Sequence, residues 1–149
     1  MKLYDSTPEQ QLLAATAWAR MEQAGELKNI FLAHERNLYK FLNRLENAPD
    51  VYYEDDAQGI WALAWYEYFF DGALFAAWIR PDMRGTREMF EQYEEALDAG
   101  KGKFPAILAT TTQEVVARLL QQTGFAWVAD LGPLMDGKHL WLYRLKETK

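Results

Sequence analysis

Residues 79–90 read IRPDMRGTREMF, and this stretch identifies the fold of the chain. It follows an apolar, strand-like run and opens a helix-like run. It also carries three arginines in a chain whose net charge is −6. The start of a helix exposes unpaired N–H groups and a positive dipole end, and both stabilise a bound anion. The stretch therefore raises the question of whether it cradles a phosphate.

The composition is that of one globular domain spanning residues 1–149. Half of the residues are hydrophobic and 15% are aromatic, which is too apolar for a disordered chain. Cysteine is absent, which excludes disulfides and thiolate metal sites. The two histidines have no cluster of carboxylates beside them in the sequence, so we expect no metal site.

The sequence also argues against membranes and nucleic acids as partners. The N-terminal residues contain no apolar signal-peptide core. The longest uncharged apolar stretch, residues 57–66, is far shorter than the roughly 20 residues that span a bilayer. The acidic balance disfavours the nucleic-acid backbone. We therefore expect a cytoplasmic protein.

The N-terminal third predicts a short strand and two helices. Residues 2–5 fit a strand, and a capping box of Thr7 and Gln10 around Pro8 predicts a helix that runs to about Gln23. A stripe of apolar residues at helical spacing, residues 27–45, predicts one further helix that carries His34 on its apolar face.

Three strands should follow. Residues 51–53 are strand-like, and residues 59–70 are apolar on both alternating faces, as in a centrally buried strand. Asp71 and Gly72 predict a hairpin turn, with a return strand over residues 73–79.

The last third alternates helices and strands. Residues 84–99 fit a helix, residues 105–110 a short buried strand, and residues 115–120 a second helix after a capping box at residues 111–114. Residues 125–131 and 140–145 fit two final strands. Strand–helix–strand passages imply parallel pairing, and the hairpin implies antiparallel pairing. A mixed α/β sheet with helices on both faces is expected.

This order and three local motifs resemble the GNAT N-acetyltransferase superfamily. The motifs are WIRPDMRG (residues 78–85), ILAT with LLQQTGF (residues 107–110 and 119–125), and GKHLWLYRL (residues 137–145). The resemblance implies a mixed, mostly antiparallel sheet of about six or seven strands with about four helices. It also implies acetyl-CoA as the coenzyme and an amine of a small molecule or protein as the acceptor.

The resemblance implies that acetyl-CoA would bind at the turn after the fourth strand. The residues it assigns to coenzyme binding are Trp78, Ile79, Arg80, Met83, Arg84, Gly85, Thr86, Arg87 and Thr110. Two departures stand out. Arg87 and Met89 replace glycines of the family pattern, and Leu120 replaces a tyrosine that protonates the departing thiolate in many members.

Candidates for a general base are few. Glu67 is the first and Asp71 the second, although each residue also fits an exposed surface acid. His34 is a further catalytic candidate, and a buried, hydrogen-bonded histidine is the alternative reading. His139 is expected at the surface.

Two functions follow from these features. The first is an acetyl-CoA-dependent N-acetyltransferase with an unusual phosphate cradle. The second is a non-catalytic structural or assembly protein with virion partners, because the chain also resembles divergent GNAT-like proteins of tailed bacteriophages. The aromatic run over residues 65–70 would suit a protein partner if part of it were exposed.

Overall fold

The computed structural model describes residues 1–146, which form a seven-stranded sheet covered by helices on both faces. The N-terminal part contains strand β1 (Lys2–Leu3), helix α1 (Pro8–Gln23), helix α2 (Leu27–Ile30), the 3-10 turn η1 (Ala33–Glu35) and helix α3 (Leu38–Asn47). Strands β2 (Asp50–Asp56), β3 (Gly59–Phe69) and β4 (Gly72–Ile79) follow. The last part contains the 3-10 turn η2 (Pro81–Met83), helix α4 (Arg87–Lys101), strand β5 (Ile107–Thr111), helix α5 (Glu114–Gln122) and strands β6 (Phe125–Asp130) and β7 (Trp141–Leu145).

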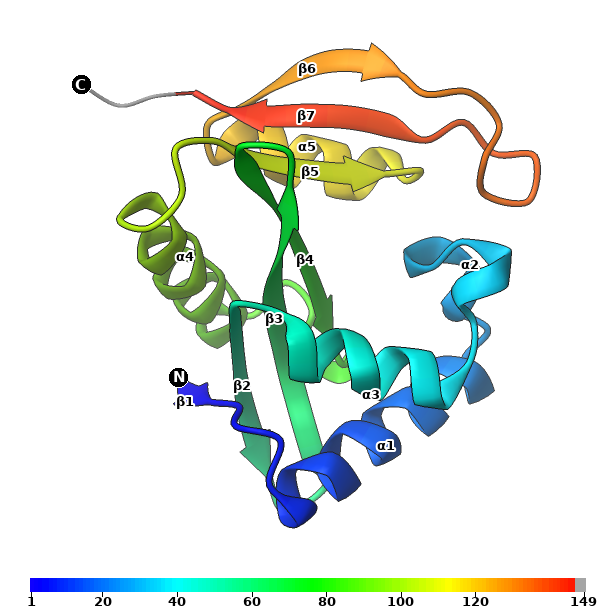
Figure 1. Ribbon diagram of the computed structural model, residues 1–149, viewed down its shortest axis with the longest axis vertical. Helices are drawn as coiled ribbons and strands as arrows, with labels where there is room; N and C mark the ends of the chain where they lie inside the picture. The colour runs from blue at the N-terminus through cyan, green and yellow to red at the C-terminus, as the bar shows by residue number, and fades with distance from the viewer. Residues whose placement is uncertain (147–149) are drawn as a thin grey trace.

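The sheet is mixed and mostly antiparallel, as predicted. Its strand order is β1-β2-β3-β4-β5-β7-β6, and β4 with β5 is its one parallel pair. Figure 1 shows β2, β3 and β4 in one half of the molecule, with β5, β7 and β6 turned away in the other half. The two halves of the sheet meet at β4 and β5.

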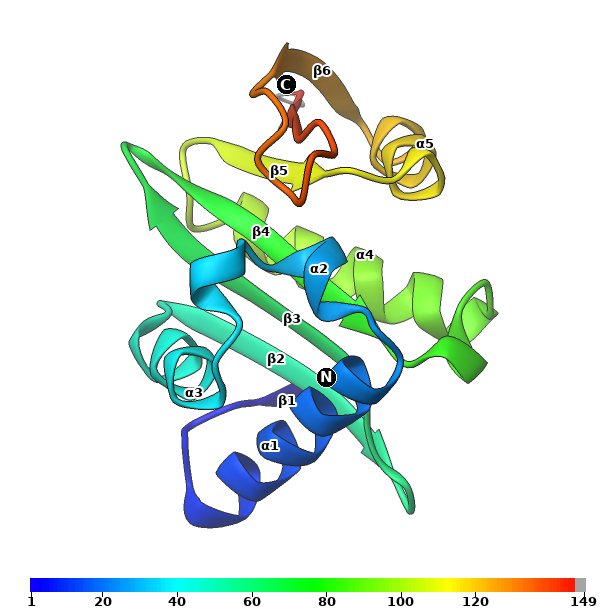
Figure 2. The ribbon, with the colours of Figure 1, turned by 90° about the vertical axis from the view of Figure 1, so that its right-hand side faces the viewer.

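The helices form two layers, one on each face of the sheet, as Figure 2 shows. Helices α1 and α3 pack on one face around a core that includes Trp18, Phe31 and Trp65. Helices α4 and α5 share a second core, which includes Tyr66 and Phe125, on the other face. No helix within residues 1–146 combines the length and apolar character that crossing a bilayer requires.

Strand β3 joins the two cores, which confirms that it is buried on both faces. Leu63 and Trp65 point into the core beneath α1 and α3, whereas Ala64 and Tyr66 point into the core beneath α4. The Tyr66 hydroxyl donates a hydrogen bond to the Ala96 carbonyl at 2.7 Å and so fastens α4 to the sheet. This arrangement places the start of α4 beside the end of β4.

The single helix predicted over residues 27–45 is wrong, because the chain breaks into α2, η1 and α3. Phe31 and Leu32 have extended backbone, and Asn37 caps a new helix by accepting bonds from the Tyr39 and Lys40 amides. Asparagine favours this capping position over a helix interior. His34 consequently lies in η1 and is exposed, instead of facing the core.

The hairpin between β3 and β4 forms, although its turn residues differ from those predicted. The turn is made by Phe70 and Asp71, and Phe70 adopts a φ of +53°. Gly72 lies in β4, where a Cβ atom would stand 2.4 Å from the Ala106 carbonyl oxygen. The glycine is therefore required for the close approach of β4 to the segment before β5.

Two helix starts also differ from the predictions. Helix α4 begins at Arg87 instead of residue 84, because Thr86 caps it and η2 occupies the preceding residues. The capping box at residues 111–114 does not form. Gln113 is the N-cap of α5 without a side-chain bond, and the Thr111 hydroxyl instead accepts from the Gln113 amide at 3.0 Å.

Candidate functional site

A slot separates β4 from β5 over most of the length of β4. The two strands pair only where Ala73 and Leu74 lie beside Ile107 and Leu108. Strand β4 continues for five more residues, through Ile79, without a partner on that side. The pairing of β4 with β5 therefore ends well before Trp78.

The backbone of β4 offers free polar groups to this slot. The Ala73 amide donates to the Ala106 carbonyl at 2.9 Å, so the backbone groups of Ala73 point toward β5. Backbone groups alternate in direction along a strand, so those of Ala77, beyond the last residues that pair with β5, point the same way. Ala77 is exposed although β4 is a central strand. The slot is open to solvent at this residue.

An unpaired polar atom lies just beyond β5, the strand on the opposite side of the slot. Strand β5 pairs with β7 through residues that include Thr110, and the other edge of β5 faces β4. Thr112, just beyond the end of β5, has a buried hydroxyl oxygen without a hydrogen-bond partner among the described residues. Buried polar atoms are nearly always paired, so this hydroxyl fits a site that a ligand completes.

A second unpaired atom lies on the α4 side of β4. The Gln92 side-chain oxygen is buried without a hydrogen bond among residues 1–146. Gln92 lines a hollow of about 10 Å³ together with Phe75, Ala77 and Tyr93. That volume holds about one water molecule. The side of the slot that faces α4 is therefore narrow.

The start of α4 lies at the end of β4 and keeps two amide donors unused. The Thr86 hydroxyl accepts from the Met89 amide at 3.2 Å, and the Gly85 amide contacts the Met89 sulfur at 3.4 Å. The Arg87 and Glu88 amides belong to the first turn, where no intrahelical acceptor exists. These two amides and the helix dipole favour an anion here.

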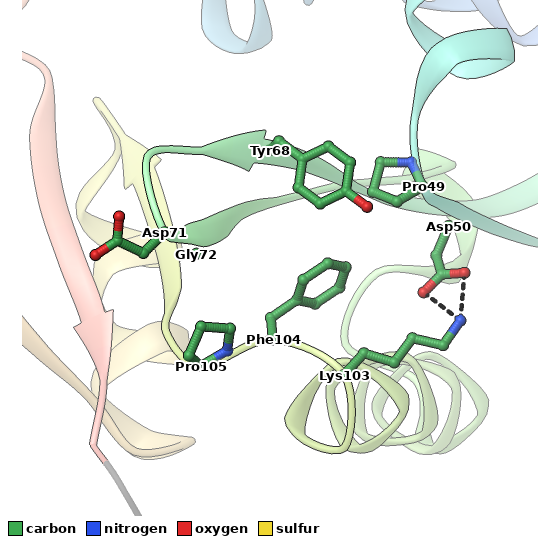
Figure 3. A pocket seen from close by; sticks show the side chains of 8 residues that line it. All are labelled: Pro49, Asp50, Tyr68, Asp71, Gly72, Lys103, Phe104 and Pro105. Atoms are coloured by element: carbon green, nitrogen blue, oxygen red, sulfur yellow. Dashed lines mark hydrogen bonds and ion pairs between the residues drawn. The ribbon is translucent and has the colours of Figure 1, made fainter.

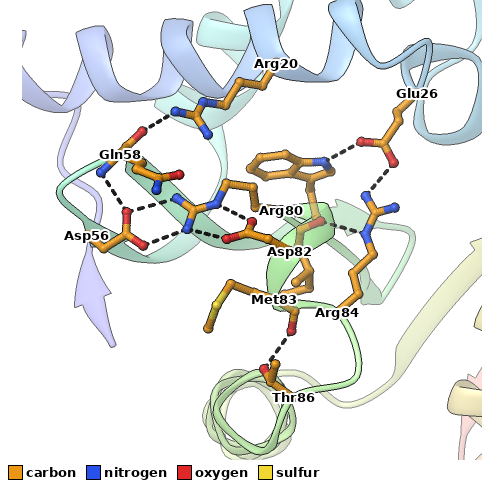
Figure 4. Close-up of polar contacts among 11 residues, drawn as sticks. Arg20, Glu26, Asp56, Gln58, Arg80, Asp82, Met83, Arg84 and Thr86 are labelled. Atoms are coloured by element: carbon orange, nitrogen blue, oxygen red, sulfur yellow. Dashed lines mark hydrogen bonds and ion pairs between the residues drawn. The ribbon is translucent and has the colours of Figure 1, made fainter.

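The predicted ligand Arg80 has a structural role. Its side chain is 4% exposed and forms four hydrogen bonds, of 2.6–3.0 Å, to the carboxylates of Asp56 and Asp82. It ties the turn after β2 to η2, as Figure 4 shows. With both carboxylates in place, four of the five N–H donors of Arg80 are engaged, and its burial keeps it from reaching a phosphate.

This Arg80 cluster predicts how stability depends on pH. The Arg80 guanidinium and the Gln58 amide lower the pKa of Asp56 to about 2, and Arg80 also lowers the pKa of Asp82. The ordinary pKa of an aspartate is about 3.9. Because the folded value is depressed, the stabilisation is present above pH 4 and is lost as the pH falls toward 2.

We expect the urea midpoint of the wild type to fall between pH 4 and pH 2. Asp56→Asn should lower the midpoint at pH 6 and make it fall less over the acid range. Urea unfolding followed by circular dichroism from pH 6 to pH 2 measures both curves. Parallel curves for the two proteins would show that Asp56 does not contribute this acid sensitivity.

The other two arginines of residues 79–90 are also paired. Arg84 donates from Nε to the Ile79 carbonyl at 2.9 Å and from Nη2 to the Glu26 carboxylate. Arg87 is 88% exposed and pairs with Glu91, one turn along α4, at 3.0 Å. Exposed pairs of this kind exchange partners readily. Arg84 and Arg87 therefore remain candidates for an anionic ligand, whereas Arg80 does not.

The remaining predicted residues shape the turn. Trp78 is buried, and its indole N–H donates to Glu26 at 3.3 Å. The Met83 carbonyl accepts from both the Thr86 amide and the Thr86 hydroxyl. Their contribution to a bound coenzyme would be to hold the backbone of the turn in place.

The predicted catalytic bases do not face a common point. Both oxygens of Glu67 accept from Arg44, at 2.6 and 2.9 Å, and the Trp65 indole N–H adds a third bond at 3.1 Å. His34 is exposed on η1, and Asp71 is exposed at the β3–β4 turn. Glu67 is therefore engaged in a structural network, and the structure brings none of the three residues to the start of α4.

Helix α5 supplies no acid in place of the missing tyrosine. Leu120 is buried, and the Thr123 hydroxyl donates to the Leu119 carbonyl at 2.8 Å. The Tyr93 hydroxyl lies 2.8 Å from the Thr123 hydroxyl oxygen, and burial raises the pKa of Tyr93. A phenol with a raised pKa is a weaker proton donor at neutral pH.

A further pocket lies away from the slot. Figure 3 shows this pocket of about 370 Å³ at the closed end, where the β3–β4 turn meets the segment before β5. Lys103 binds the buried carboxylate of Asp50 there at 2.6 and 2.8 Å. This pocket was not predicted, because its lining comes from three segments that are far apart in the chain.

Comparisons with known proteins agree with this geometry. No family model matches the chain, and no curated protein matches it. Among solved structures, a Streptococcus mutans protein superposes with a TM-score of 0.74 at 14% identity, covering 98% of this chain and 99% of that one. A spermidine N-acetyltransferase of Vibrio cholerae has a TM-score of 0.70 at 13% identity, and the match covers 97% of this chain and 94% of that one. A GNAT-family protein of Desulfovibrio desulfuricans has a TM-score of 0.69 at 14% identity, and the match covers 97% of this chain and 96% of that one. The chain therefore has the GNAT fold.

Proposed function

We propose that the protein is an N-acyltransferase that transfers an acetyl group from acetyl-CoA to an amine of a small molecule or of a protein. One observation carries the proposal: the outer five residues of β4 lack a strand partner on the β5 side and lead to a helix start whose Arg87 and Glu88 amides have no intrahelical acceptor. A ligand with an extended arm and a diphosphate fits this combination. The similarity in fold to acetyltransferases supports the same assignment.

Different residues of the slot would bind different parts of the coenzyme. The amides of Arg87 and Glu88 would hold the diphosphate, with Arg84 as the side chain within reach. The backbone groups of Ala77, which point toward β5 beyond the paired residues, would hold the pantetheine arm as a strand-like partner. The Thr112 hydroxyl, buried and unpaired, would complete the site at the opposite wall.

The thioester of acetyl-CoA would supply the acyl carbon. A bond forms between this carbon and the amine nitrogen of the acceptor, and the bond between the carbon and the CoA sulfur breaks. The amine loses one proton and the thiolate gains one. Glu67, the first candidate base, is held by Arg44, and Leu120 occupies the position of the expected tyrosine. Solvent would then carry both protons, and positioning would supply most of the acceleration. We expect turnover to be slow.

A thiol-release assay tests this function directly. The chain contains no cysteine, so any thiol that appears with acetyl-CoA and an amine belongs to free CoA. We expect release that requires both the protein and an amine, within a panel that includes spermidine, simple primary amines and peptide N-termini. Release equal to the protein-free blank for every amine would contradict the transferase assignment.

A role in virion assembly stays a prediction from the sequence resemblance alone. The aromatic run does reach the surface, since Tyr68 is 73% and Phe70 is 91% exposed at the β3–β4 turn. No contact in the structure indicates what would cover these rings. Copurification with other virion proteins would support that role.

A further inference from the structure

Glu26 connects the helical layer of α1 to the turn that leads into α4. It lies between α1 and α2, and its side chain is only 14% exposed. One carboxylate oxygen accepts from the Trp78 indole N–H at 3.3 Å, and the other accepts from the Arg84 guanidinium. The same carboxylate therefore holds a residue of β4 and a residue of the turn.

Arg84 is directed away from the helix start whose anion it is expected to bind. Figure 4 shows its guanidinium reaching toward Glu26, whereas Thr86 and the first turn of α4 lie on the other side. Its Nε atom stays on the Ile79 carbonyl at 2.9 Å, and only its Nη2 donates to Glu26. A change of partner would therefore move the outer end of the side chain and leave its base in place.

The other two arginines of residues 79–90 are less suited to bind an anion at the start of α4. Arg80 is buried between two aspartates, and Arg87 projects into solvent beside Glu91. Arg84 is thus the half-exposed arginine beside Gly85, and a carboxylate already neutralises it. Carboxylates and phosphates are recognised by the same planar donor fork of arginine.

We propose that Glu26 is an internal competitor that occupies Arg84 until the diphosphate of the coenzyme replaces it. This inference rests on the proposed coenzyme and names the residue that limits its affinity. Before binding, Glu26 keeps Arg84 paired. After binding, Arg84 bridges to the diphosphate, and Glu26 keeps its bond to the Trp78 indole. Glu26 is a positioning residue in this scheme.

Calorimetric titration with CoA tests the competition through Glu26→Gln. The glutamine keeps an acceptor for Trp78 and the size of the side chain, but it removes the charge that attracts Arg84. We expect CoA to bind about three- to fivefold more tightly, as suits the loss of a competing, partly exposed ion pair. Glu22→Gln is the matched control, because Glu22 is an exposed acid near the end of α1, and the affinity of this variant should equal that of the wild type.

A second pair of variants separates competition from general repulsion between Glu26 and phosphate. Arg84→Ala should weaken CoA binding about tenfold, as expected for losing a charge-assisted contact. In the Arg84→Ala variant, adding Glu26→Gln should not increase the affinity for CoA, because no arginine remains to be released. Titration with pantetheine, which has the same arm without a diphosphate, should show no effect of Glu26→Gln.

Each outcome decides between the two proposals. Equal CoA affinity in the wild type and Glu26→Gln, or an equal gain on the Arg84→Ala background, overturns the competition. A gain in CoA binding without acetyl transfer to any amine supports the competition and contradicts the transferase. If no variant binds CoA at millimolar concentration, both proposals fail. Matching thermal unfolding curves establish that Glu26→Gln is folded.

Discussion

Ala77→Phe should raise the Kd for acetyl-CoA at least about 100-fold, close to abolishing binding, while the protein unfolds at the same urea concentration. Ala77 is exposed where β4 has left β5, so a larger side chain there can extend toward solvent past the narrow hollow that Ala77 shares with Gln92 and Tyr93. It would instead fill the space that the pantetheine arm requires. Phenylalanine is also favoured in strands.

Calorimetry with acetyl-CoA and urea unfolding measure the two halves of this expectation. Val128→Phe is the matched control, because Val128 is 45% exposed on strand β6 at the far edge of the sheet. The control should bind acetyl-CoA like the wild type. Unchanged binding in Ala77→Phe would show that the arm does not lie along β4.

Trp65→Ala should lower the free energy of unfolding by about 3–5 kcal/mol, which is the cost of removing a buried tryptophan. Trp65 is 1% exposed and packs against Phe31 and Phe41, with ring centroids 6.3 and 6.1 Å away. The substitution would leave a cavity between β3 and the helices α1 and α3. It would also remove a donor from Glu67.

Urea unfolding measures this loss as a shift of the midpoint at constant slope. Trp127→Ala provides the comparison, since Trp127 is 56% exposed on β6, and its loss should cost less than about 1 kcal/mol. Similar costs for the two tryptophans would contradict the packing described here. Because this core carries α1 and the loop with Glu26, Trp65→Ala should also weaken CoA binding at elevated temperature.

Local sequence signals predicted most elements of the fold. The Thr7–Gln10 capping box and the doubly apolar strand β3 are confirmed, and so is the order of helices and strands. These features depend on neighbours within a few residues. The break between α2 and α3 was missed, because the apolar stripe continues across it and the capping asparagine, Asn37, outweighs it.

The coenzyme site stays a prediction from the resemblance. The resemblance pointed to the turn around Arg84 and Gly85, and the structure places an open slot and a helix start there. The partners of the arginines could not be read from the sequence. Asp56 and Glu26 are 24 and 58 residues away from the arginines they bind, and only the folded sheet brings them together.

The same reasoning explains why the sequence did not single out Glu26 or Gly72. Glu26 is one of many exposed-looking acids in an acidic chain, and its low exposure follows from the packing of α1 against the end of β4. Gly72 carried a turn signal, yet its necessity comes from the Ala106 carbonyl across the sheet. Both are consequences of contacts between segments far apart in the chain.

The central claim is that the gap between β4 and β5 receives the coenzyme. Amide NMR spectra of the labelled protein, recorded while acetyl-CoA is added, test it most directly. We predict that the perturbed amides cluster at Phe75, Ala77, Thr112, Arg87 and Glu88. Perturbations confined to the pocket around Asp50 and Lys103, or none at millimolar acetyl-CoA, would contradict the claim.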